Sequence, residues 1–194
     1  IKTSGNAASN NAKLEFGDVN SVGQLTKLTL DDGAETITIN AAQGLDTPVG
    51  QFQFSKTSTT DADHQGDVVF FGGTTGMTAG RIYHYKSDGT WELANPNAAS
   101  TSDGLLGVAL GGNSDVDGML LRGTVTLDHN PGSIGDVLYL NEAAAPSGTP
   151  THGRATNGAP AGNGDIVRVV GYCISSSAAT GQIWFNPDNT FVEV

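Results

Sequence analysis

The chain has 194 residues, enough to bury the core of one domain or of one domain with an appended segment. Its formal charge of −11 makes nucleic acid and anionic membrane surfaces poor partners, because both are negatively charged. Charged residues are only 15% of the sequence, which argues against disorder, and 27 glycines among many short apolar runs predict an all-β protein.

The chain begins at Ile1, without a methionine and without the pattern of a signal peptide. We therefore expect a processed product or a fragment of a longer chain. The sequence has no run of about 18 apolar residues, so we expect no segment that inserts into a membrane.

The first 60 residues predict an extended, β-rich segment. Residues 1–13 are small and polar, which is typical of a linker or an extended arm. Residues 25–39 alternate β-branched or leucine side chains with polar ones around Asp32-Gly33, the pattern of a β-hairpin. We predict residues 1–60 as a hairpin, arm or fibre-shaft segment, followed by a separate module over 61–194.

The module predicts a small β-barrel or β-sandwich built from a duplicated three-strand unit. Its first copy contains Gly80–Tyr85, Leu105–Leu110 and Gly118–Leu121, and its second contains Gly135–Leu140, Val169–Ile174 and Gly181–Phe185. The alignment places Gly107 on Gly171 and Ile82 on Val137. The copies differ in length mainly in the loop after the first strand, where insertions cost least.

Three further segments of the module carry structural predictions. The apolar run Asp67–Phe71 suits a buried strand. The turn Ser87–Thr90 should return Trp91 toward the core. The stretch Pro146–Asn163 is rich in Gly, Pro, Thr and Asn and predicts an ordered but exposed loop.

One segment resembles the opening of a calcium-binding loop. Asn113, Asp115 and Asp117 offer oxygen atoms at alternate positions and are followed by Gly118. The twelfth position is Thr124 instead of glutamate, and a strand follows instead of a helix. An Asp-Gly turn between strands is therefore the alternative to a calcium site, and we expect no other cofactor.

The sequence predicts a protein that is not an enzyme, with no catalytic residues. No nucleophile elbow or phosphate-binding loop occurs, and most carboxylates lie beside glycines in turns. Paired acids of the glycosidase type stay open, because their spacing depends on the fold. The histidines are dispersed; His84 alternates with two tyrosines and is expected to face solvent or a neighbouring subunit. Residues 61–64 suit a solvated loop or, alternatively, a cation site.

Cys173 lies in an apolar run and is expected in the core, where a lone cysteine acts as a small hydrophobic residue. Trp91 and Trp184 each lie in an apolar strand context, which favours packing on their own sheets. The alternative is that they stack against sugar rings.

The module resembles a known family through a series of segments spread over about residues 66–194. They are Trp91–Ala94, Leu105–Leu110, Asp117–Gly123, Gly135–Leu140, Val170–Ile174 and Trp184–Asp188. Together they resemble the C-terminal module of tailed-phage virion structural proteins, such as the tail or head fibres of marine cyanophage-type myoviruses. Two of the segments are also similar to small β-barrel capsid decoration proteins.

The resemblance implies a non-enzymatic role in the virion, as a homotrimer that contacts other virion proteins. It carries over no catalytic or ligand-binding residues. A second hypothesis is a receptor-binding tip, in which the 146–163 loop and the Asp88-Gly89 turn contact a host surface glycan. A third is a filament-forming bacterial surface or matrix protein whose N-terminal arm inserts into a neighbour's sheet.

Overall fold

A computed structural model describes residues 2–4, 13–15, 60–141 and 152–194. The chain divides into two compact units, Ile1–Gln51 and Phe52–Val194, and each is described by itself. In the first unit, β1 (Lys2–Ser4) pairs antiparallel with β2 (Lys13–Glu15), so both strands begin within the segment predicted as a linker or arm. The hairpin predicted over residues 25–39 lies outside the described residues.

The second unit is all-β, which confirms the predicted fold class. Among its described residues, helical structure is limited to one turn of 3-10 helix, η1 (Ala99–Thr101). The strands are β3 (His64–Val69), β4 (Ile82–Tyr85), β5 (Trp91–Leu93), β6 (Leu106–Ala109), β7 (Met119–Leu127), β8 (Val137–Leu140), β9 (Ala155–Thr156), β10 (Ile166–Val167), β11 (Val169–Ser175), β12 (Gly181–Phe185) and β13 (Val192–Glu193).

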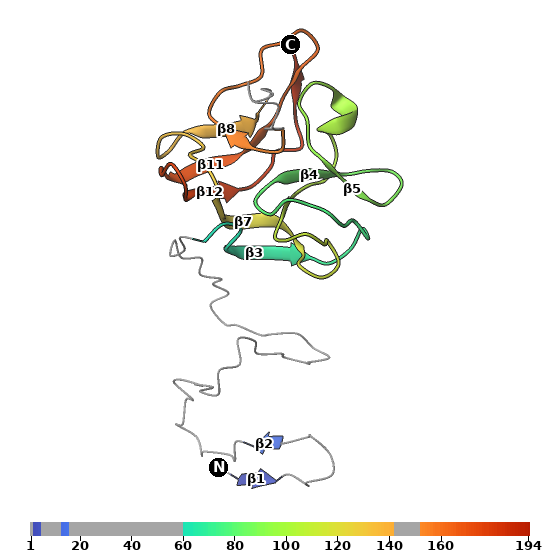
Figure 1. The fold of residues 1–194 in the computed structure, drawn as a ribbon, viewed down its shortest axis with the longest axis vertical. Helices are drawn as coiled ribbons and strands as arrows, with labels where there is room; N and C mark the ends of the chain where they lie inside the picture. The colour runs from blue at the N-terminus through green and yellow to red at the C-terminus, as the bar shows by residue number, and fades with distance from the viewer. Residues whose placement is uncertain (1, 5–12, 16–59, 142–151) are drawn as a thin grey trace, which may run out of the picture. The chain divides into compact units, whose positions relative to one another are not determined.

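Nine of these strands form one antiparallel sheet that curls strongly into half a barrel (Figure 1). Their order is β5-β4-β6-β7-β12-β11-β8-β9, and β3 pairs with β7 outside this path. The two halves of this order mirror each other. In the first copy β4 pairs with β6 and β6 with β7, and the short strand β5 lies beside β4. In the second copy β8 pairs with β11 and β11 with β12, and the short strand β9 lies beside β8. The duplicated unit is therefore confirmed, and the pairing of β7 with β12 joins its two copies.

The alignment of single residues between the copies is wrong by one position in the first strand. Ile82 faces the core and is 1% exposed, whereas its predicted counterpart Val137 is 36% exposed on the outer face. The residue that faces the core in the second copy is Leu138. The register between β8 and β11 shifts between Val169 and Gly171. Such a bulge adds one residue to a strand, and the spacing of glycines does not reveal it.

A row of close backbone contacts crosses the sheet where it bends. Gly66 on β3 faces Gly123 on β7, Gly123 faces Phe185 on β12, and Phe185 faces Gly171 on β11. The three glycines have φ values of +155°, +144° and +154°. A Cβ atom on any of them would lie 2.0 Å from a carbonyl oxygen of a facing strand. Glycine at these positions lets the sheet coil tightly enough to enclose a core.

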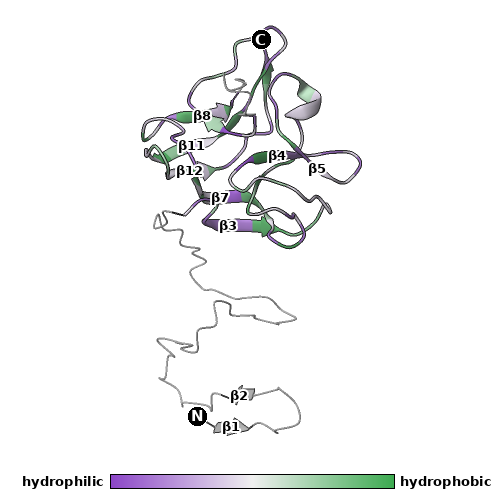
Figure 2. Ribbon diagram, viewed as in Figure 1, coloured by the Kyte–Doolittle hydropathy of each residue, from purple (hydrophilic) through white to green (hydrophobic). Residues whose placement is uncertain are grey.

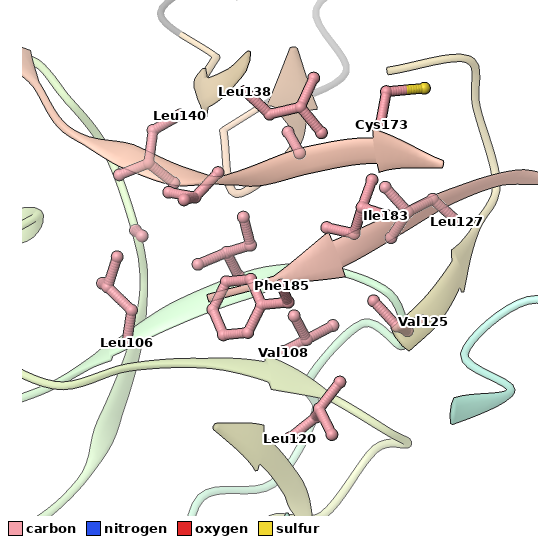
Figure 3. Close-up of a cluster of buried hydrophobic side chains, with 14 residues drawn as sticks. Leu106, Val108, Leu120, Val125, Leu127, Leu138, Leu140, Cys173, Ile183 and Phe185 are labelled. Atoms are coloured by element: carbon pink, nitrogen blue, oxygen red, sulfur yellow. The ribbon is translucent and has the colours of Figure 1, made fainter. Parts of the chain in front are cut away.

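The main core fills the inner face of the curled sheet. Figure 3 shows side chains from β6, β7, β8, β11 and β12 that point toward one another between the strands. Cys173 belongs to this cluster, as predicted. The buried members are Ile82, Ala94, Leu106, Val108, Leu120, Val125, Leu127, Leu138, Leu140, Ala155, Val170, Cys173, Ile183 and Phe185. Burial of one large aliphatic or aromatic side chain contributes about 1.5–3 kcal/mol, so this cluster supplies most of the driving force for folding.

A second apolar cluster covers the outer face of the first copy. Its buried members are Met77, Tyr83, Trp91, Ala109 and Met119. The indole nitrogen of Trp91 donates a hydrogen bond of 2.8 Å to the carbonyl oxygen of Phe71, whose ring stacks on the indole at a centroid distance of 5.7 Å. The predicted return of Trp91 to the core by the turn after β4 is confirmed. The segment that follows β3 therefore acts as a lid over this face.

Two other predictions are corrected. Asp67–Phe71 is not a buried strand, because β3 ends at Val69 and Phe70 is 60% exposed. In Figure 2 the colour of β3 changes from hydrophilic to hydrophobic toward this end. Residues 146–163 are not wholly an exposed loop. Their described part contains β9, which pairs with β8 and places Ala155 in the core. Residues 142–151 lie outside the described residues.

Candidate functional site

The segment predicted as a calcium loop forms a turn stabilised by its own side chains. Asp117 Oδ2 accepts the backbone N–H of Asn113 at 2.8 Å, and Asn113 Oδ1 accepts that of Asp115 at 2.9 Å. Asp115 Oδ1 accepts the backbone N–H of Gly73 at 2.8 Å, which ties the turn to the lid. One oxygen of each residue is thus engaged by a backbone donor, as in the Asp-Gly turn that was the alternative. Calcium binding stays a prediction.

The described residues do contain a cluster of charged groups centred on Asp128, at the end of β7. Arg154 donates a hydrogen bond to Asp128 Oδ2 at 2.9 Å, and Arg81 lies 3.6 Å from the same oxygen. His129 Nδ1 lies 2.8 Å from the other carboxylate oxygen. The pKa of Asp61 is raised by burial and by the charge of Asp128. The cluster joins segments that are far apart in the sequence, before β3, before β4, after β7 and before β9.

The charges in this cluster compensate one another. Burial acts to raise the pKa of Asp128, but the hydrogen bond to His129 and the charges of Arg154 and Arg81 outweigh it and leave that pKa below the ordinary value. The pKa of Arg81 is lowered by burial and by the nearby Arg154. Arg81 and Arg154 thus share one carboxylate oxygen of Asp128 and hold these segments together.

His84 is buried, so the expectation that it faces solvent or a subunit neighbour is wrong. Its side chain lies on the inner side of β4, with Nε2 at 3.2 Å from Glu92 Oε2 on β5. The alternation with Tyr83 and Tyr85 is real, but here the tyrosines take the outer face, beneath the lid in the case of Tyr83. Because both faces of β4 are covered, its alternation does not separate buried from exposed residues.

Arg168 is a buried arginine that links three segments, and sequence reasoning did not single it out. Its guanidinium donates hydrogen bonds of 2.8 Å to the carbonyl oxygens of Ser102 and Gly104, and its Nε donates to the carbonyl oxygen of Asp188. Burial lowers its pKa, opposed by the charges of Asp103 and Asp188. All its strong contacts are to backbone oxygens, so its role is to hold the loop before β6 and the C-terminal segment against β11.

The outer face of the second copy carries the aromatic side chains Tyr172 and Trp184. A single cross-strand row runs from Gln65 on β3 through Thr124, Trp184 and Tyr172 to Val137 on β8. Tyr172 is 46% exposed, and Trp184 is half-buried. Trp184 thus packs on its sheet while part of it stays at the surface. The alternation of inward and outward side chains along β11 and β12 could have identified Tyr172 as the outward neighbour of Trp184.

Comparison with known protein families, with curated proteins and with solved structures found no match. In the described part of the chain, no group of three or more His, Cys, Asp or Glu residues is placed to hold a metal ion. The same residues form no helix of the length and hydropathy that a membrane crossing requires.

Proposed function

We propose that this chain is a non-enzymatic structural protein of a bacteriophage virion, a fibre or decoration module that assembles with itself as a trimer and contacts other virion proteins. The proposal rests on the resemblance of residues 66–194 to tailed-phage virion proteins and on one structural observation. That observation is an exposed apolar patch at the end of β3.

The patch consists of Phe70, Phe71 and Val116, and we call it the Phe70 patch. Phe70 is 60% exposed and Val116 is 71% exposed. The Phe70 ring lies against the backbone of Gly118, two residues from Val116, so the side chains come from neighbouring loops. Exposed apolar side chains on neighbouring loops favour protein–protein contacts, because the cores of such interfaces are poor in charge. The patch therefore suits packing against another copy of the chain.

The roles of the charged residues support a structural function. Asp128 joins segments within the fold, Arg168 holds backbone carbonyls, and Asp88 stabilises the turn between β4 and β5. In that turn, hydrogen bonds from Thr90 and Lys86 lower the pKa of Asp88 to about 2. Each of these groups is explained by the fold itself, without a substrate.

The oligomeric state tests this proposal. Light scattering coupled to size-exclusion chromatography should give three times the chain mass of 19.9 kDa. Phe70→Asp and Val116→Asp should each shift the mass toward the monomer, because a charge in a packed interface is strongly unfavourable. Phe191→Asp is the matched control, since Phe191 is also exposed but lies near the C-terminus. A wild-type chain that stays monomeric at micromolar concentration contradicts the proposal.

The same measurement distinguishes the trimer from the filament hypothesis. A filament predicts a mass that rises without limit as the protein concentration increases. Antibody labelling of the virion in electron micrographs would test whether the chain belongs to the particle, and whether to its head or tail. Recognition of a host glycan is the alternative function, and the exposed ring of Tyr172 on the second copy favours it.

A further inference from the structure

The sequence contains two Asn-Gly dipeptides, Asn157-Gly158 and Asn163-Gly164. Spontaneous deamidation is fastest at this dipeptide, because glycine has no side chain to hinder attack by its own backbone nitrogen. Both asparagines are exposed, so water reaches both side chains. A difference between the two sites therefore depends on how the fold holds the attacking nitrogen and the side-chain amide.

Deamidation needs these groups and water. The backbone nitrogen of the glycine attacks Cγ of the asparagine, so that a new N–Cγ bond forms and the Cγ–Nδ2 bond breaks. The proton of the glycine N–H leaves with the departing amide group as ammonia. Water then opens the succinimide ring at either carbonyl group, which gives aspartate or isoaspartate. Neither an oxidant nor a reductant takes part.

The fold holds the nitrogen of Gly164 in a paired backbone segment. Its N–H donates a hydrogen bond to the carbonyl oxygen of Val194, and the N–H of Val194 donates to the carbonyl oxygen of Asp165 at 3.0 Å. These bonds continue the pairing of β10 with β13. The pairing must open before this nitrogen can attack Asn163.

The nitrogen of Gly158 is held less tightly. Its N–H lies 3.4 Å from Thr156 Oγ1, beyond the ordinary hydrogen-bond range of about 2.7–3.2 Å, and Gly158 is exposed. The side-chain amide of Asn157 does have a partner, because its Nδ2 donates to Asp136 Oδ2 at 2.8 Å. That bond lies at the surface, where water competes for both groups, so it resists ring closure less than a paired backbone does.

We propose that Asn157 is a site of spontaneous deamidation and that Asn163, in the same dipeptide, is protected by the fold. The reaction adds a negative charge to a chain whose formal charge is already −11. The assignment rests on contacts within one chain, so it does not depend on the oligomeric state.

Deamidation at Asn157 breaks a link between two segments. It replaces the donor to Asp136 with a carboxylate, so that two like charges face each other across a contact of 2.8 Å. The same oxygen of Asp136 accepts the N–H of Ser133 at 2.8 Å, and the N–H of Asn157 donates to the carbonyl oxygen of Pro131 at 2.9 Å. The modification therefore loosens the loop before β8 from the segment after β9.

Peptide mapping of the full chain by mass spectrometry tests the assignment. The protein is incubated at mildly alkaline pH, and both sites are quantified in the same samples. We expect Asn157 to deamidate about three- to tenfold faster than Asn163, a factor that corresponds to one hydrogen bond. In urea the two rates should be similar, because the unfolded chain protects neither site. If Asn163 reacts as fast as Asn157 in the folded protein, or if Asn157 stays intact over a period that converts it in urea, the proposal is wrong.

Gly158→Ala tests the attacking nitrogen. The φ of Gly158 lies outside the left-handed region, and a Cβ atom there would lie 4.0 Å from Thr156 Oγ1, so alanine fits the fold. The added methyl group should slow deamidation of Asn157 several-fold and leave the melting temperature unchanged. An unchanged rate in this variant would overturn the assignment.

Asn157→Asp carries one product of the reaction from the start. It should lower the melting temperature at neutral pH, because its new carboxylate faces Asp136. Adding Asp136→Asn to this variant restores one donor to the contact and should recover most of the loss. If Asn157→Asp melts at the temperature of the wild type, the predicted loosening is wrong.

Discussion

Substitution of Gly123 by alanine should destabilise the module more than its small change in size suggests. The new Cβ atom would lie 2.0 Å from a carbonyl oxygen on β3, and this neighbour is backbone that cannot rotate away. The residue would also keep a φ of +144°, a conformation that costs a non-glycine residue about 1–3 kcal/mol. Separation of β3 from β7 would weaken further hydrogen bonds, each worth about 0.5–1.5 kcal/mol. We expect a total loss of about 3–5 kcal/mol.

Urea unfolding followed by tryptophan fluorescence measures this loss as a shift in midpoint at constant slope. Gly73→Ala is the matched control, because Gly73 also has a positive φ of +57° but a Cβ atom there would meet nothing within 4 Å. It should cost about 1–2 kcal/mol, the conformational part alone. If the two variants lose equal stability, the close approach of the strands contributes nothing and the reasoning is refuted.

Three further predictions concern single residues. Arg168→Ala leaves the carbonyl oxygens of Ser102 and Gly104 without their donor. The free energy of unfolding measured in urea should fall by about 3–5 kcal/mol. An unchanged urea midpoint would show that these hydrogen bonds are dispensable. Because the pKa of Asp128 is lowered in the fold, Asp128→Asn should destabilise at pH 7, and its difference from the wild type should shrink as pH falls through that lowered pKa. Because the pKa of Asp61 is raised in the fold, its ionised form opposes folding at neutral pH. Asp61→Asn should therefore raise the midpoint of thermal unfolding at pH 7 but not below about pH 3, where the carboxyl group is protonated in both states. A lower midpoint than the wild type at pH 7 would contradict this prediction. If the Asn113–Asp117 turn binds calcium, the melting temperature should rise with added calcium and return with a chelator; no shift favours the turn alone.

Much of the module could be predicted from the sequence, because its signals are local. Strands bounded by glycine, the turn before Trp91 and the apolar setting of Cys173 depend on residues within a few positions of each other. The repeated order of three strands is also visible along the chain. These features follow from backbone preferences and from the alternation of side chains across a sheet.

Other features depend on which surface a second segment covers. Alternation along β4 shows two faces, but only the packed lid decides that His84 and Tyr83 are both buried. The run after Asp67 is apolar, yet Phe70 lies beyond the end of β3 and is exposed. The register shift between Val169 and Gly171 on β11 depends on the pairing with β8, and no local pattern marks it.

The sequence by itself determined the β-strands, the turns and the duplication, since each depends on short-range conformational preference. Only the tertiary structure brought Arg81, Asp128 and Arg154 together and aligned the glycines of three strands at close backbone contacts. It also buried Tyr83 and Trp91 on the outer face of one copy while it left Tyr172 exposed on the other. These outcomes depend on the register and curvature of the sheet, which arise from pairings between distant segments and have no counterpart in local sequence.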